Sequence, residues 1–177
     1  MTEITLYFMI ITSHFVATTS VLLLAKRFGI NITNEIIIWT YIFGNLIDID
    51  HLVASPKLGL RRLKESLFRL NHNKVEPGKY YIHSVLQEPW LFVVMAVVSF
   101  AIYLRTNNGA IFLPASALGV HILLDVIMKF ENKLLWPFSK KGYYGWLKSD
   151  TVIEYVLSIV ATIIVIYFAF QERLFVF

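Results

Sequence analysis

The chain has 177 residues, of which 57% are hydrophobic and only 16% are charged. A soluble globular domain carries about 25% charged residues, so the composition excludes an ordinary water-soluble domain and predicts a single integral membrane domain over 1–177. The formal net charge is +4, and the absence of cysteine excludes disulfides and thiolate ligands, so a transition-metal site must use His, Asp and Glu.

Hydrophobic windows predict about five transmembrane helices, each near the roughly 17–25 residues that cross a bilayer. In chain order they are residues 6–24, 36–53, 85–104, 110–128 and 152–170. The first lacks a basic segment before it and a small-residue cleavage site, so we predict a retained helix. Residues 59–73 form an amphipathic pattern that fits either an interfacial helix or a solvated one. The predicted fold class is therefore an all-α polytopic membrane helical bundle.

Basic residues predict the orientation. With a cytoplasmic N-terminus, the segments 54–82 and 129–150 are cytoplasmic and carry 12 of the 16 Lys and Arg residues. The other four are Lys26, Arg27, Arg105 and Arg173. Cytoplasmic segments of membrane proteins are enriched in Lys and Arg, so this bias predicts a cytoplasmic N-terminus and an outer C-terminus.

Ionisable residues interrupt or flank every predicted span. They are His14, Asp48, Asp50, His51, His83, His121, Asp125 and Glu154. Each costs several kcal/mol at bilayer depth unless it is paired or faces a cavity. A metal ion bound by several of these residues would offset the cost of burying their charged and polar groups.

Their spacing and the alternating topology place these residues in one layer near the cytoplasmic face, with His14 as its deep floor. His121 and Asp125 lie at i, i+4, and Asp48 and His51 at i, i+3, so each pair shares a helix face. Two simpler interpretations stay open: His14 as a hydrogen-bonded core residue, and Glu154 as the N-terminal cap of the last helix.

The motifs around these residues resemble the YdjM-like family of membrane-bound metal-dependent hydrolases, which is grouped by fold with zinc-dependent phospholipases C and P1-type nucleases. The matching segments run in order from 14 to 154: His14, Ile47-Asp48-Ile49-Asp50-His51, Tyr81-Ile82-His83-Ser84, His121-x3-Asp125 followed by Trp136-Pro137, and Glu154. Ile47 replaces the family's Pro, and Gly78-Lys79-Tyr80 replaces its His-Arg-Gly.

The resemblance implies a phospholipase C/P1-nuclease-like fold and a hydrolase with two or three zinc ions, with manganese or iron as other ions that the same ligands accept. The implied metal ligands are His14, Asp48, His51, His83, His121, Asp125 and Glu154. Asp48 or Asp50 would act as the catalytic base. The expected substrate is a phospholipid or other lipid-linked phosphate at the cytoplasmic face of a prokaryotic cytoplasmic membrane. The basic segments would attract it there, and no nucleic-acid partner is expected.

Two other functions are compatible with parts of this pattern. His14 and His121 on separate helices could ligate a b-type haem. The intramembrane carboxylates could instead serve a cation or proton carrier. Against the first, a haem iron gains nothing from Asp48, Asp50 and Asp125; against the second, the polar groups gather at one face and do not cross the bilayer.

The orientation is testable by labelling single cysteines in intact cells. A cysteine at Asn107 should react with an impermeant reagent from the outside, and one at Lys141 should be protected until the membrane is opened. The reverse pattern would contradict the predicted topology.

Overall fold

A computed structural model describes residues 3–46, 89–127, 131–132, 138–139, 141–146 and 152–174. This part contains five α-helices: α1 (Glu3–Arg27), α2 (Asn34–Gly44), α5 (Pro89–Thr106), α6 (Leu113–Ile127) and α7 (Val152–Gln171). The 3-10 helix η2 (Gly109–Phe112) leads into α6. Two short strands, β1 (Glu131–Asn132) and β2 (Tyr143–Tyr144), pair antiparallel, an element that the sequence did not predict. The predicted all-α class is confirmed.

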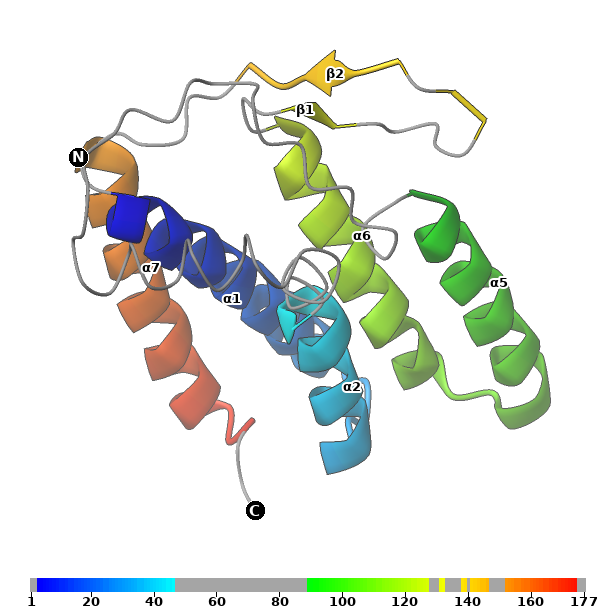
Figure 1. The fold of residues 1–177 in the computed structure, drawn as a ribbon. Helices are drawn as coiled ribbons and strands as arrows, with labels where there is room; N and C mark the ends of the chain where they lie inside the picture. Colours follow the sequence, from blue (N-terminus) through cyan, green and yellow to red (C-terminus); the bar gives the residue numbers. More distant parts are fainter. Residues whose placement is uncertain are drawn as a thin grey trace.

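Helices α1 and α6 form the centre of the bundle. Helix α1 packs against α2, α6 and α7, and α6 packs against α1, α2 and α5. The described helices alternate in direction along the chain, so the end of α6 and the β-strands lie at one end of the bundle (Figure 1). The end of α1, the start of α2, the α5–η2 turn and the end of α7 lie at the other (Figure 1).

Helix α2 is short because both of its ends are capped. The Thr33 side chain accepts a hydrogen bond from the backbone N–H of Ile36 at its start. Asn45 leaves the helical backbone conformation at its end, and its N–H donates to the carbonyl of Tyr41. The sequence predicted a span over residues 36–53; α2 ends at Gly44, and residues 47–53 lie outside the described part of the chain. Asn45 ends the helix because Asn side chains favour helix ends. The long apolar run around it masks this signal in a hydropathy plot.

Helices α1 and α7 both end in a Schellman motif, in which one residue takes a left-handed conformation and the next donates back into the last turn. In α1 this residue is Gly29, with φ of 77°, and Ile30 N–H donates to the carbonyl of Ala25. In α7 it is Arg173, with φ of 50°. A side chain in this conformation costs about 1–2 kcal/mol, so Arg173 occupies a position that suits glycine better.

Two helical segments are long and apolar enough to cross a membrane. They are Pro89–Thr106, with mean hydropathy 1.7, and Gly109–Ile127, with mean hydropathy 2.0. On α5, large apolar side chains such as Val97, Phe100 and Leu104 are 63%, 53% and 68% exposed. An apolar face of this extent is unfavourable in water and suits contact with lipid. All five predicted spans contain a helix of the structure, but the number of spanning helices stays a prediction.

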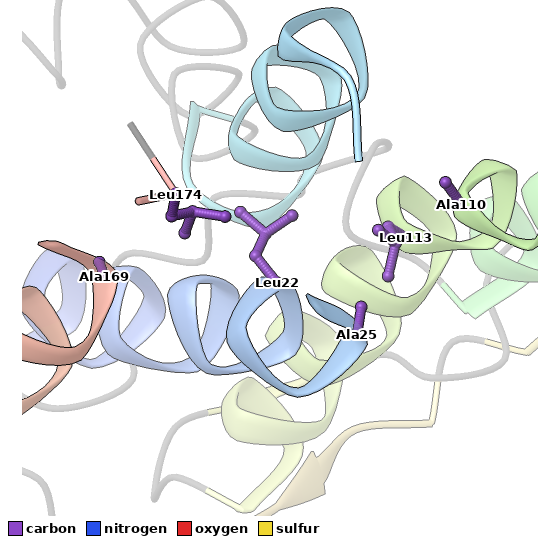
Figure 2. Close-up of a cluster of buried hydrophobic side chains, with 6 residues drawn as sticks. All are labelled: Leu22, Ala25, Ala110, Leu113, Ala169 and Leu174. Atoms are coloured by element: carbon purple, nitrogen blue, oxygen red, sulfur yellow. The ribbon is translucent and has the colours of Figure 1, made fainter. Parts of the chain in front are cut away.

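The apolar core lies where α1, α6 and α7 meet at the end of the bundle that holds the α5–η2 turn. Leu174, just after α7, lies beside Leu22 of α1, and Ala25 of α1 lies beside Leu113 at the start of α6 (Figure 2). Ala110 and Ala169 complete this cluster. The small side chains let the helices approach closely, which is how membrane helices gain packing energy without a hydrophobic driving force.

Gly44 marks a close approach of α2 to α1. A Cβ added at this position would clash with the hydroxyl of Thr18 and lie 2.9 Å from its methyl group and 3.1 Å from the Ala117 Cβ. Gly44 is itself buried. The absence of a side chain here is therefore a packing requirement. The sequence, in which Gly44 simply precedes the helix cap Asn45, does not reveal this requirement.

Gly44→Ala should lower the stability of the fold by about 1–3 kcal/mol, because overpacking forces α1, α2 and α6 apart. The measurement is thermal unfolding of the purified protein in detergent. Gly109→Ala is the matched control, since a Cβ there meets nothing within 4 Å. Equal melting temperatures for the two variants would contradict the packing described here.

Candidate metal centre

Two helices bring two histidines and one carboxylate together in the interior of the bundle. His14 lies midway along α1, and His121 and Asp125 lie one turn apart on α6. Their exposed fractions are 0%, 1% and 8%. His14 Nε2 lies 3.3 Å from Asp125 Oδ1, and His121 Nε2 lies 3.3 Å from Asp125 Oδ2. One carboxylate thus offers a different oxygen to each imidazole.

The end of α2 fixes the orientation of His121. Its Nδ1 lies 3.0 Å from the carbonyl oxygen of Gly44. A carbonyl can only accept, so Nδ1 carries the hydrogen and, in the neutral ring, the lone pair is on Nε2. This is the arrangement of metal-binding histidines, whose second nitrogen donates to a carbonyl or a carboxylate.

About one turn after His14, a hydrogen bond between Thr19 of α1 and Tyr41 of α2 holds the two helices together. The hydroxyl of Thr19 donates to the carbonyl of Phe15 at 2.7 Å, and it lies 2.7 Å from the phenolic oxygen of Tyr41. Because the Thr19 hydrogen is used by Phe15, the Tyr41 hydroxyl donates to Thr19. Thr18, on the same turn, meets Gly44. These contacts set the distance between α1 and α2 next to His14.

The three side chains fit a divalent metal ion. Each offers one ligand atom, and these atoms lie within 4.8 Å of one another. Among the residues that the structure describes, neither nitrogen of His14 has a hydrogen-bond partner, although both are buried. Its Nε2 nevertheless lies 3.3 Å from Asp125 Oδ1. Buried polar atoms are almost always satisfied, so an imidazole with unsatisfied nitrogens beside a carboxylate is compatible with a role as a metal ligand. The cluster could hold a metal ion.

The ring geometry argues against the haem interpretation. The rings of His14 and His121 stack with centroids 3.9 Å apart and planes inclined by 20°. Two axial haem ligands approach the iron from opposite faces of the porphyrin. Stacked rings in contact leave no room for a porphyrin between them, so these two histidines do not form such a pair in this arrangement.

The other predicted site residues are not placed by this structure. Asp48, Asp50, His51 and His83 lie outside the described residues. Glu154 lies in the first turn of α7, but its side chain also lies outside the described part. Their assignment as ligands, and that of Asp48 or Asp50 as a base, stays a prediction. The amphipathic segment 59–73 lies outside the described residues as well.

Sequence reasoning did not identify the backbone contribution of α2. The Gly44 carbonyl, which orients His121, has no side chain to attract attention. Asn45, the next residue, has both atoms of its side-chain amide buried and without a hydrogen-bond partner in the described structure. A glycine followed by an asparagine inside an apolar stretch was the available signal, because this pair ends a helix and leaves a carbonyl unpaired.

Comparison with known proteins identifies the family. The family model described as YdjM inner membrane protein matches residues 9–176, and the chain belongs to this family. No curated protein and no solved structure matches the chain. The family is thus a membrane protein family, in agreement with the apolar helices α5 and α6.

Metal content tests the cluster directly. Asp125→Asn should strongly reduce the zinc that the purified protein retains, since it removes the charge shared by both histidines at almost unchanged volume. Elemental analysis after dialysis measures the effect, with Glu172→Gln as a control carboxylate outside the cluster. If Asp125→Asn and the control retain zinc equally, the cluster is not a metal site.

Proposed function

We propose that this member of the YdjM family is a membrane-embedded, metal-dependent hydrolase. We further propose that it is a phosphoesterase acting on a phospholipid or lipid-linked phosphate at the cytoplasmic face. The observation that carries the proposal is the buried group of His14, His121 and Asp125, with ligand atoms within 4.8 Å of one another.

A purely structural role explains this cluster poorly. A charged carboxylate out of contact with water costs several kcal/mol, and apolar residues of similar volume commonly replace buried ion pairs without loss of stability. Here the cluster lies among apolar helices, next to Leu118 and Ile122 of the same helix α6. A group of this kind at membrane depth is by default a candidate functional site.

The residues of the cluster would have separate roles. Asp125 would supply the negative charge, and His121 would be held as a neutral ligand through its hydrogen bond to Gly44. His14, on α1, would be the third metal ligand. A zinc ion, when bound, supplies Lewis acidity that polarises a phosphoryl oxygen and lowers the pKa of water. We propose Asp48 or Asp50 as the group that accepts the proton of the attacking water.

The substrate class is proposed from the surroundings of the cluster. The exposed apolar faces of α5 and α7 would keep the bundle in the bilayer, so a substrate with acyl or prenyl chains can approach the protein laterally. Twelve of the 16 basic residues lie in the two segments assigned to the cytoplasmic side. Such segments attract anionic headgroups at about 1 kcal/mol per basic residue near the surface.

The proposal is tested by hydrolysis assays with detergent-purified protein on phospholipids, polyprenyl phosphates and a generic phosphodiester. On the best substrate, Asp125→Asn should lower turnover by more than the roughly 10–100-fold typical of changes to the outer partners of a metal. Chelation should remove activity, and added zinc should restore it.

His72→Ala serves as the control histidine, because the sequence places His72 on the amphipathic segment and not among the ligands. Its turnover should stay close to that of the unmodified protein. Full activity of Asp125→Asn, or activity that survives exhaustive chelation, would rule out the metal-dependent mechanism while leaving the family assignment intact.

A further inference from the structure

A second feature lies along α2, and none of His14, His121 and Asp125 lines it. A groove of about 360 Å³ runs along this helix and is almost entirely apolar. Ile37, Ile38, Tyr41, Ile42 and Leu46 line it from α2 and its end, and Leu174 lines it from the end of α7. Asn34, at the start of α2, also contributes. We call this feature the α2 groove.

The dimensions of the α2 groove match one acyl chain. Its α2 residues recur at the spacing of one helix face, from the first residue of the helix to just beyond its last. Ten residue steps between Asn34 and Gly44 correspond to about 15 Å. This is half of the roughly 30 Å hydrocarbon thickness of a bilayer, so the groove is as long as one leaflet.

Three basic residues lie at the end of the bundle where the groove begins. Lys26 and Arg27 form the last turn of α1, and Arg173 directly precedes the groove residue Leu174. The Lys26 ammonium donates to the backbone carbonyl of Arg173 at 3.0 Å, which joins the end of α1 to the end of α7. Glu35 and Glu172 lie at the same end, but no ion pair joins a described carboxylate to these three cations.

The conformation of Arg173 adds a separate argument. Arg173 has φ of 50°, whereas the equivalent position of α1 is occupied by Gly29. Glycine would form the same helix end without steric cost. Strained residues of this kind concentrate at ligand sites, so the retained guanidinium indicates a role beyond the turn.

We propose that the α2 groove binds a glycerophospholipid of the leaflet at this end of the bundle. One acyl chain would lie along α2, and the phosphate would contact Lys26, Arg27 and Arg173. Charge and shape are both needed for this occupant: the cations select the phosphate and the apolar groove accepts the chain. The phosphate would lie at the opposite end of α2 from the Gly44 carbonyl, so the proposed headgroup contacts are separate from the cluster of His14, His121 and Asp125.

The test uses delipidated protein in detergent, titrated with phosphatidylglycerol and followed by native mass spectrometry. We expect one tightly bound lipid per chain. Arg173→Gly should weaken binding about tenfold or more, while its melting temperature without lipid stays equal or rises because the backbone strain is relieved. Arg105→Gln is the matched control: it removes a cation at the same end but on α5, away from the groove, and should bind normally.

Two further ligands separate the contributions. Glycerol phosphate, which has the charge without the chains, and diacylglycerol, which has the chains without the charge, should both bind far more weakly than phosphatidylglycerol. The proposal is overturned if the unmodified protein binds no lipid above the level of Arg173→Gly, or if Arg105→Gln loses as much binding as Arg173→Gly. Equal binding of diacylglycerol would overturn the assignment of the phosphate to the cations.

Discussion

The carboxylate of Asp125, enclosed between two imidazoles, constrains the arrangement of the whole bundle. Water cannot compensate charge in an apolar interior, so the partners of Asp125 must come from the protein. His121 approaches from the same helix, whereas His14 has to be brought by α1. Helix α2 lies close to both of these helices, because the bare backbone of Gly44 packs against Thr18 of α1 and Ala117 of α6. The contacts of α1, α2 and α6 are therefore a single arrangement centred on one charged side chain.

Much of the helical fold could be predicted from the sequence, because lipid leaves few choices for an apolar chain: its backbone groups must be satisfied within each segment. Each predicted span contains a helix. Helix ends were less predictable. The run from Ile36 to Ile47 is apolar almost throughout, and hydropathy alone does not reveal that Asn45 stops α2 after 11 residues. The pairing of Glu131 with Tyr144 was not foreseen either, since two-residue strands leave no periodic pattern.

For the candidate site, the sequence revealed the residue types but not the supporting backbone. His121 and Asp125 were singled out because a spacing of four residues places polar groups on one helix face, and the structure joins them to His14 as expected from the cost of isolated charge. The hydrogen bond from His121 to Gly44 could not be predicted, since a carbonyl acceptor carries no signature in the side chains. Nor could the stacking of the two rings, which depends on how deeply α1 and α6 interpenetrate.

The early end of α2 has an electrostatic consequence. The last carbonyls of a helix lack partners and carry roughly half a negative charge in sum, and the Gly44 carbonyl is one of them. The negative pole of α2 is therefore directed at the imidazole of His121, where the field is little screened. Such a field attracts a cation and repels an anion. For the proposed hydrolase, an anionic phosphate would meet a repulsive potential at this site until a divalent ion reversed its sign, so the proposal favours metal binding before substrate binding.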